Sequence, residues 1–190
     1  MKFVEEEYIA SFDEKKSKFI SHLIPYKDFD KTMQNLRANH QKAVHFVYAY
    51  RYLNEFEQIV ENSSDDGEPK GTSGKPALAV LSGAEIINTA VIIVRYFGGI
   101  KLGTGGLVKA YSNSVNEVIK VANFKNYKKL ISKTLECSYA FLSQLEYLLN
   151  QQNIKITKKD FENSVKVHIE LSNDEFNNLT SLLPREIKII

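Results

Sequence analysis

The chain has 190 residues, enough for one large domain or two small ones, and its 43% hydrophobic and 25% charged residues are ordinary for a globular protein. The formal net charge of +2 is too small for charge alone to identify a nucleic-acid-binding protein. The single cysteine, Cys137, excludes an intrachain disulfide and a thiolate metal site, and we expect it to be a core residue in a strand.

The pattern of the first two thirds of the chain predicts strands and helices separated by polar segments. Strand-like runs on either side of the polar stretch 13–17 predict a hairpin. A β-branched run at 90–94 predicts a strand that is buried on both faces. In chain order we expect strands 2–11 and 18–26, helix 28–40, strands 43–53 and 56–60, helix 73–81, strand 90–94 and helix 107–124.

The strand expected at 43–53 carries a histidine, three tyrosines and an arginine. Aromatic and guanidinium groups can stack on the bases of single-stranded nucleic acid, and they can equally serve as core and rim packing. The histidine reads as a neutral residue buried in a sheet rather than a catalytic base, because no nucleophile pattern such as G-x-S-x-G accompanies it. From this strand motif we select His45, Tyr48, Tyr50 and Arg51.

The segment 62–76 is rich in Gly, Pro, Ser and acidic residues, and this density predicts a loop. Its carboxylates have two interpretations. In the one that we favour, they accept hydrogen bonds from local N–H groups in an ordinary turn. In the other, Asp65 and Asp66 hold a divalent cation through oxygen ligands, although the spacing is not that of an EF-hand. From this acidic loop we select Asp65, Asp66, Glu68, Lys70, Thr72 and Ser73.

Five of the nine glycines lie between the strand at 90–94 and the next helix. A glycine loop between a strand and a helix binds anions, because its backbone can approach a ligand and the free N–H groups at the helix start favour negative charge. The spacing is neither that of a Walker loop, which needs lysine at Thr104, nor that of the dinucleotide fingerprint, which ends here at Val108. A tight turn that needs glycine for packing alone is the alternative. The selected anion-binding residues are Arg95, Gly98, Gly99, Lys101, Gly103, Gly105, Gly106 and Lys109.

After about residue 128 the pattern starts again with short elements. We expect strand 130–139, helix 141–152, strand 154–158, a turn near 159–160, strand 165–171, helix 173–183 and strand 186–190. This order, βαββαβ, is that of the ferredoxin-like split unit, and about 60 residues suit it. The sequence therefore predicts an α+β protein with domains at 1–127 and 128–190.

Three long motifs, at 45–51, 64–76 and 94–111, make the chain resemble the Impact family, including its bacterial YigZ-like branch. The resemblance spans nearly the whole chain, since 130–190 is similar to the extra C-terminal domain of the bacterial members. Phe46 and Val47 stand where the family usually has a second His and a Cys, which argues against a metal or nucleophile role for that strand.

The resemblance implies a first domain like the second domain of ribosomal protein S5 and a second like the last domain of elongation factor G. Both folds recur in proteins that contact RNA or the translation machinery. Eukaryotic members of the family regulate translation by competing for the activator of a stress-responsive kinase. The resemblance thus implies a partner that is RNA, the ribosome or a translation-associated protein.

We therefore expect a non-enzymatic regulator of translation or of a stress response. The alternatives are an enzyme that acts on a phosphorylated small molecule through the glycine loop, and a protein–protein adaptor. We select no catalytic residue, no metal ligand and no cofactor apart from the cation alternative given for the acidic loop. The acidic N-terminus does not resemble a signal peptide, and the run 90–94 is far shorter than the roughly 20 residues that span a bilayer, so we expect a cytoplasmic protein without a membrane partner.

Overall fold

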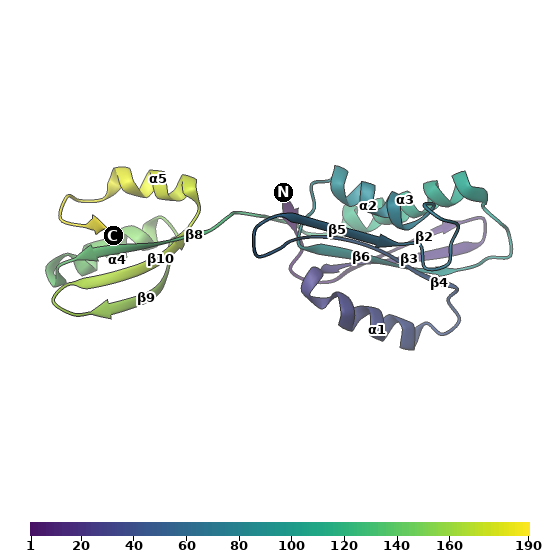
Figure 1. Ribbon diagram of the computed structural model, residues 1–190, viewed down its shortest axis with the longest axis horizontal. Coiled ribbons are helices and arrows are strands. Elements are labelled where there is room, and N and C mark those ends of the chain that lie inside the picture. The colour runs from purple at the N-terminus through teal and green to yellow at the C-terminus, as the bar shows by residue number, and fades with distance from the viewer. The chain divides into compact units, whose positions relative to one another are not determined.

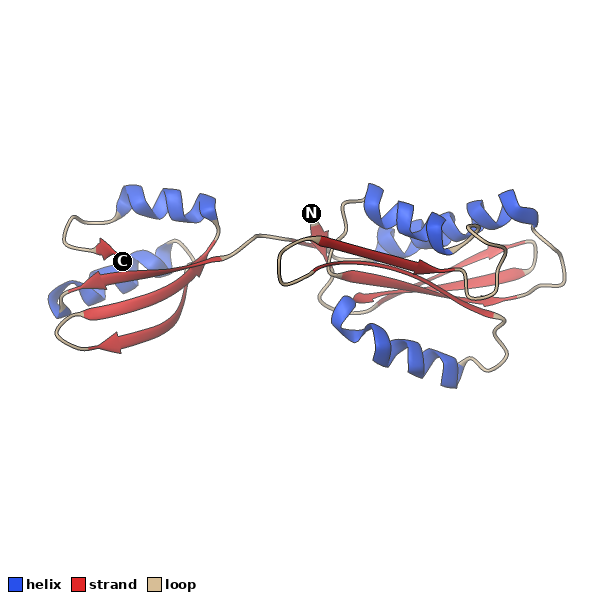
Figure 2. Ribbon diagram, viewed as in Figure 1, coloured by secondary structure: helices blue, strands red, loops and turns tan.

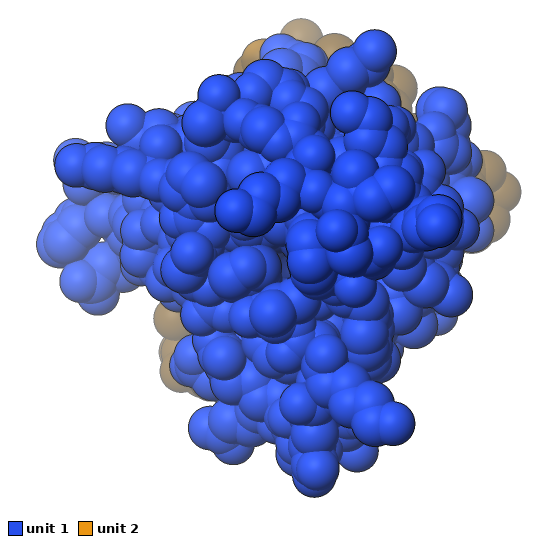
Figure 3. Space-filling model, turned by 90° about the vertical axis from the view of Figure 1, so that its right-hand side faces the viewer, with its two compact units in different colours: residues 1–127 blue, residues 128–190 orange.

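The computed structural model of the protein describes residues 1–190 and divides into two compact units, Met1–Tyr127 and Lys128–Ile190, which Figure 3 distinguishes by colour. Each unit mixes helices with strands and encloses its own buried apolar side chains. The predicted α+β class with two domains is confirmed. No helix is both long and apolar enough to cross a membrane.

Unit 1 is built on a five-stranded antiparallel sheet in the order β2-β3-β6-β4-β5 (Figure 2). The central strand is β6, and all of its residues except the last are buried, as its β-branched run predicts. A separate two-stranded ribbon pairs β1 with β7. The strands are β1 (Lys2–Phe3), β2 (Tyr8–Glu14), β3 (Ser17–Pro25), β4 (His45–Leu53), β5 (Ile59–Ser64), β6 (Thr89–Tyr96) and β7 (Lys125–Asn126).

Helix α1 (Phe29–Asn39), preceded by the 3-10 turn η1 (Tyr26–Asp28), covers one face of this sheet, and α2 (Gly74–Gly83) and α3 (Gly103–Val121) cover the other (Figure 1). Alternate residues of β4 point to opposite faces. Val47 packs in the core beneath α2 and α3, whereas Phe46 packs in the core beneath α1. The sheet of unit 1 therefore has an α1 face and an α2–α3 face.

Unit 2 has the predicted order βαββαβ and a four-stranded antiparallel sheet in the order β11-β8-β10-β9. Alternate residues of β10 are buried together with leucines of both helices, so the helices cover one face of the sheet. Cys137 is a buried core residue of β8, as expected. The elements are β8 (Ile131–Cys137), the 3-10 turn η2 (Tyr139–Phe141), α4 (Leu142–Gln151), β9 (Lys155–Phe161), β10 (Val165–Leu171), α5 (Asn173–Leu182) and β11 (Lys188–Ile189).

Several predicted boundaries are wrong. Strand β5 begins at Ile59 and runs into the segment predicted as loop, because it pairs with β4 residue by residue as far as Ser64. The turn predicted near 159–160 lies inside β9, which pairs with β10 up to Phe161. Helix α3 begins at Gly103, four residues earlier than predicted. The predicted first residue of α3 was too late because the glycines before 107 were assigned to the loop. Glycine is nevertheless tolerated in a first turn, whose N–H groups have no partner in the helix.

Gly98 is required by the close approach of two chain segments. A Cβ at this position would lie 2.0 Å from the carbonyl carbon of Lys16, in the turn between β2 and β3, and 2.4 Å from the backbone nitrogen of Ser17. The Gly98 N–H also donates to the Ser17 hydroxyl at 3.2 Å. This glycine therefore serves the fold by seating the end of β6 against the β2–β3 hairpin.

We predict that Gly98→Ala lowers the free energy of unfolding of unit 1 by about 3 kcal/mol, because the new methyl group can be placed only by moving backbone. Urea denaturation combined with hydrogen exchange of unit 1 peptides measures this change. Gly83→Ala is the control, since nothing lies within 4 Å of the added Cβ at the end of α2. That variant should be about 0.5–1 kcal/mol more stable than the natural chain. Equal stabilities of the two variants would contradict the packing role of Gly98.

Candidate functional site: a groove between β6 and α3

A groove of about 390 Å³ opens on the α2–α3 face of unit 1, where β6 ends and α3 begins. We call it the β6–α3 groove. It brings together three segments that are far apart in the sequence, namely the start of β4, the acidic loop and the glycine-rich segment. Its lining residues are His45, Glu68, Pro69, Arg95, Phe97, Lys101, Leu102, Gly103, Thr104 and Leu107.

A buried ion pair between Arg95 and Glu68 forms the floor of the groove. Arg95 Nη1 donates to Glu68 Oε1, and both residues are more than nine-tenths buried. The hydroxyl of Tyr111, in α3, donates to the same carboxylate oxygen at 2.7 Å. Burial, and after it the Glu68 carboxylate, raise the pKa of Tyr111 far above its ordinary value, so the hydroxyl remains a donor. Three segments are thus joined at one carboxylate.

Arg95 still has an unused donor. Its Nε is buried and has no hydrogen-bond partner in the protein. A buried donor without a partner costs free energy, and such groups in native proteins call for an explanation. A ligand or water molecule that reaches the groove floor would provide one.

His45 is held so that one ring nitrogen faces the groove floor. Its Nδ1 lies 2.7 Å from the backbone carbonyl of Asp66, which can only accept, so Nδ1 carries the hydrogen. The other nitrogen, Nε2, lies 3.8 Å from Glu68 Oε1. The sequence predicted a buried neutral histidine, whereas the structure places a half-buried one in the groove wall.

The first turn of α3 presents unpaired N–H groups at the groove. The N-cap residue Leu102 makes no side-chain cap, and no acidic residue lies in the first turn. The first N–H groups of a helix have no partner inside it, and the helix dipole adds positive potential there. Lys101, which is exposed, stands immediately before this turn. The N-terminus of α3 is therefore a place where negative charge is stabilised.

The corresponding end of α2 is already occupied by Asp65. Oδ1 of Asp65 accepts from the Ser73 N–H at 3.1 Å, the Ser73 hydroxyl at 2.7 Å and the Gly74 N–H at 2.9 Å. Oδ2 accepts from the Gly71 N–H at 2.7 Å. Burial opposes ionisation, but the hydrogen bonds from Gly71, Ser73 and Gly74 together lower the pKa of Asp65. Asp65 therefore acts as an internal cap of α2.

Asp66 also bonds within the protein. Its Oδ1 accepts from Arg37 at 2.8 Å, and its Oδ2 accepts from the Phe46 N–H at 2.6 Å. Every carboxylate oxygen of Asp65 and Asp66 thus has a protein donor, and no group of three or more His, Cys, Asp or Glu side chains is arranged to hold a metal ion. We therefore propose that these two residues hold the acidic loop in place rather than bind a divalent cation.

Of the remaining residues selected from the acidic loop, some make contacts within the protein and others lie at its surface. The Thr72 hydroxyl donates to the Pro69 carbonyl at 2.6 Å, and Ser73 is fully buried beside Asp65. Lys70 is exposed and does not line the groove. Only Glu68 from this set reaches the groove.

The strand motif is split between the two faces of the sheet. Tyr48 and Tyr50 lie on the α1 face, where both rings contact Phe29 edge-on. Arg51 is buried, pairs with Glu61 at 2.6 Å and donates to the Ile86 carbonyl at 2.8 Å. Period-two alternation separates these side chains from one another, and only His45 enters the groove.

The glycines and lysines selected with Arg95 also have different roles. Gly98 packs on the hairpin, and Gly99 and Gly103 have positive φ angles of 85° and 70°. Gly106 would place a Cβ 3.2 Å from that of Leu102, whereas nothing lies within 4 Å of a Cβ on Gly105. Lys101 lines the groove, and Lys109 is exposed elsewhere on α3.

Five of the lining residues were not selected from the sequence, and two of them, Phe97 and Thr104, carry groups that a ligand could contact. Phe97 is 49% exposed at the groove, with its ring centroid 5.8 Å from the guanidinium carbon of Arg95. Thr104 adds a hydroxyl in the first turn of α3. Both positions flank selected residues between the end of β6 and the start of α3, and that proximity was the only signal available for them.

The chemistry of the groove favours an anion next to an apolar or aromatic group. The negative charge of Glu68 is matched by Arg95, so the uncompensated groups are Lys101, the N–H groups of α3 and the Thr104 hydroxyl. All of these can donate hydrogen bonds to a phosphate-like oxygen. The exposed ring of Phe97 offers a surface for stacking beside them.

Comparisons with known proteins agree with this organisation. Residues 15–119 match the family model of the Impact N-terminal domain, and residues 135–184 match that of a domain of unknown function, DUF1949. The IMPACT family member YigZ of Escherichia coli (strain K12) is 38% identical over 160 residues, which are 83% of this chain and 78% of YigZ. The IMPACT family member YvyE of Bacillus subtilis (strain 168) is 32% identical over 165 residues, 85% of this chain and 75% of YvyE. A crystal structure described as that of a hypothetical protein covers 100% of this chain and 95% of its own, with a TM-score of 0.67 and 31% identity.

We predict that Asp65→Ala lowers the free energy of unfolding of unit 1 by about 2–3 kcal/mol, because four buried or half-buried donors lose one charged acceptor. Asp65→Asn should also make stability less dependent on pH. The folded-state pKa of Asp65 is lowered, so its contribution is present above the ordinary value of about 3.9 and is lost as the pH falls through the folded-state value.

Acid titration of stability, compared between the natural chain and each variant, measures this effect. Asp13→Asn is the matched control, because Asp13 is an exposed aspartate of β2, away from the acidic loop. The control should leave the fall in stability at acid pH unchanged. If the stability of Asp65→Asn falls at acid pH in the same way as that of the natural chain, the capping role of Asp65 is ruled out.

Proposed function

The chain belongs to the Impact family, and we propose that its first unit binds RNA through the β6–α3 groove as part of a role in regulating translation. The observation that carries this proposal is the meeting of an uncapped helix N-terminus, a buried arginine with an unused donor and an exposed phenylalanine in one groove. Regulation of translation is the process that membership of this family implies.

The phosphate of a nucleotide fits the polar end of the groove. A phosphate at the first turn of α3 would accept from backbone N–H groups and would lie beside Lys101. Nη1 of Arg95 pairs with Glu68, so the charge of Arg95 is already balanced and Arg95 adds no free positive charge to the site. A site of this kind holds one or two phosphates and not a long stretch of backbone.

The base of the same nucleotide fits the apolar end. Base stacking on an exposed aromatic ring supports binding to single-stranded RNA without requiring a particular sequence. Phe97 is half exposed and lies next to the phosphate donors, so one ring and one anion site together match one nucleotide of a flexible strand. A double helix, whose bases are stacked on one another, would not offer a base to Phe97.

We predict that short single-stranded RNA binds the full chain in a salt-dependent manner. With about two phosphates contacted, the logarithm of the association constant should fall with the logarithm of salt concentration at a slope of about −1.4. Lys101→Gln should weaken binding about tenfold and make the slope shallower by about 0.7, because one phosphate contact is lost. Fluorescence anisotropy with a labelled oligonucleotide measures both quantities.

Lys31→Gln removes the same charge from an exposed position of α1, on the other face of the sheet, and serves as the control. Phe97→Ala should weaken binding without changing the salt slope, because stacking carries no counterion release. The RNA proposal is overturned if single-stranded and structured RNA both fail to bind at low salt and the chain does not co-sediment with ribosomes. A Lys101→Gln variant with unchanged affinity and slope would remove the groove as the site.

Gly105 provides a second test that does not alter charge. It lies in the first turn of α3, and nothing lies within 4 Å of an added Cβ. Gly105→Ala should therefore raise the stability of unit 1 by about 0.5–1 kcal/mol. If the phosphate approaches bare backbone at this turn, the same variant should bind RNA at least severalfold more weakly. A more stable variant with unchanged RNA affinity would place the phosphate elsewhere.

A further inference from the structure

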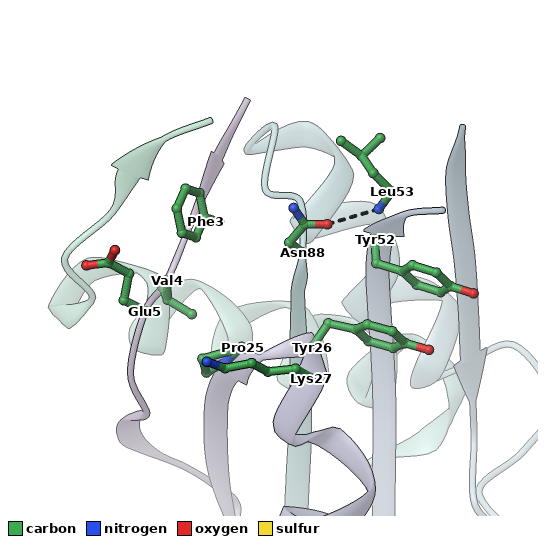
Figure 4. Close-up of a pocket in the computed structure, with 9 residues that line it drawn as sticks. All are labelled: Phe3, Val4, Glu5, Pro25, Tyr26, Lys27, Tyr52, Leu53 and Asn88. Carbon is green, nitrogen blue, oxygen red and sulfur yellow. Dashed lines mark hydrogen bonds between the residues drawn. The ribbon is translucent and has the colours of Figure 1, made fainter. Parts of the chain in front are cut away.

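A second cavity lies on unit 1 (Figure 4), and its lining includes the end of β4, whereas the β6–α3 groove includes the start of β4. It has a volume of about 440 Å³ and is bounded by the N-terminal segment, the η1 turn and the end of β4. Most of its walls are aromatic or aliphatic, including Phe3, Tyr26 and Tyr52. We call it the Tyr52 pocket. Small-molecule sites have this size and this composition, with a few polar groups that determine orientation.

The aromatic wall is flat. The rings of Tyr26 and Tyr52 lie one above the other, with centroids 4.1 Å apart and planes inclined by 5° (Figure 4). The two rings cover each other's inner faces and both residues are half-buried, so a ligand can stack only on an outer face of the pair. A planar ligand gains contact area and favourable ring geometry against such a surface. The shape of the wall therefore favours an aromatic or heteroaromatic ring.

Asn88 supplies fixed polar recognition in the pocket. Its Oδ1 accepts from the Leu53 N–H at 2.9 Å, which determines the orientation of the amide (Figure 4). Its Nδ2 lies on the other side of the amide, away from this bond (Figure 4). Two donor hydrogens are thus available to a ligand that carries a ring nitrogen or a carbonyl oxygen.

Two charged side chains complete the lining. Lys27 is exposed, follows Tyr26 directly and makes no ion pair in the protein. Glu5 is exposed on the N-terminal segment and lies 3.8 Å from Lys125. An ammonium group suits a phosphate, and a carboxylate accepts from sugar hydroxyls.

We propose that the Tyr52 pocket binds a nucleotide. The base lies against the aromatic wall and accepts from Asn88 Nδ2, the phosphate lies near Lys27, and the ribose hydroxyls face Glu5. Each polar group of the lining then has a partner of matching chemistry. The nucleotide is either a free nucleoside monophosphate or the terminal nucleotide of an RNA strand.

This site is separate from the β6–α3 groove. The groove includes His45, the first residue of β4, and lies on the α2–α3 face, whereas Tyr52 lies near the end of β4 on the α1 face. Seven residue steps along a strand correspond to about 23 Å. One nucleotide cannot occupy both sites, so each can be tested without the other.

The test is titration of the full chain with nucleoside monophosphates, the matching nucleosides and ribose 5-phosphate, followed by ligand-observed NMR. We expect dissociation constants of about 1 mM or tighter for at least one monophosphate, weaker binding of its nucleoside and no binding of ribose 5-phosphate. Lys27→Gln should lower the affinity for the monophosphate about five- to tenfold, to that of the nucleoside, and leave nucleoside binding unchanged.

Two further variants test the base contacts. Asn88→Asp keeps an oxygen for the Leu53 N–H but removes the amide donors, so nucleoside binding should fall about tenfold without loss of the fold. Tyr52→Leu removes the aromatic surface and should weaken monophosphate and nucleoside equally. Lys31→Gln, which removes an exposed charge from α1 outside both sites, is the control and should leave binding of the monomers unchanged. Lys101→Gln separates failure of the pocket from failure of RNA binding in the groove, because monomer binding that persists in this variant comes from the pocket.

A competition experiment between monomer and oligonucleotide distinguishes a free nucleotide from the end of an RNA strand. A short oligonucleotide that displaces the monomer, and does so less well in Lys27→Gln, indicates a strand end as the ligand, whereas a monomer that is not displaced indicates a free nucleotide. The proposal is overturned if no monophosphate binds, if ribose 5-phosphate binds as well as the monophosphates, or if N-acetyltyrosinamide binds as well as the nucleosides. The last result would assign the pocket to an aromatic side chain of a protein partner.

Discussion

The ion pair between Arg95 and Glu68 is the interaction on which the groove depends. It joins the end of the central strand to the acidic loop, and the Tyr111 hydroxyl adds α3 to the same carboxylate. Buried charges of this kind contribute little net stability as a pair, but removal of one partner leaves the other uncompensated and costs about 3–5 kcal/mol. The contact therefore fixes the positions of the three segments that form the groove relative to one another.

The same contact explains how an acidic loop can border a site for anions. Asp65 caps α2, Asp66 holds Arg37 and the start of β4, and Glu68 is neutralised by Arg95. All three carboxylates are thus directed into the protein. The first turn of α3, which has no acidic residue and no side-chain cap, remains the uncompensated end of a helix dipole. Local charge at the groove is positive although the neighbouring sequence is acidic.

The two possible binding sites of unit 1 lie at different ends of one sheet and on different faces of it. Alternation along β4 sends His45 to the α2–α3 face and Tyr48, Tyr50 and Tyr52 to the α1 face. A motif that is continuous in sequence is therefore not continuous in space. The groove at one end has the groups that suit a phosphate and a stacked base, and the pocket at the other end has a flat aromatic wall with a fixed amide.

The sequence by itself determined the two-domain α+β organisation, the buried central strand and the order βαββαβ, because these follow from local hydrophobic periodicity and turn residues. Its motifs also contained His45, Glu68, Arg95, Lys101 and Gly103, which line the groove. Only the tertiary structure decided that Asp65 accepts from the start of α2, that Asp66 accepts from Arg37 and the Phe46 N–H, that Arg51 is buried and that Phe97 is exposed. The pocket around Tyr52 had no sequence signal, since its walls come from four separate segments. The physical reason is that periodicity records which face of an element is buried, whereas the partner of each polar group depends on contacts between residues that lie tens of positions apart.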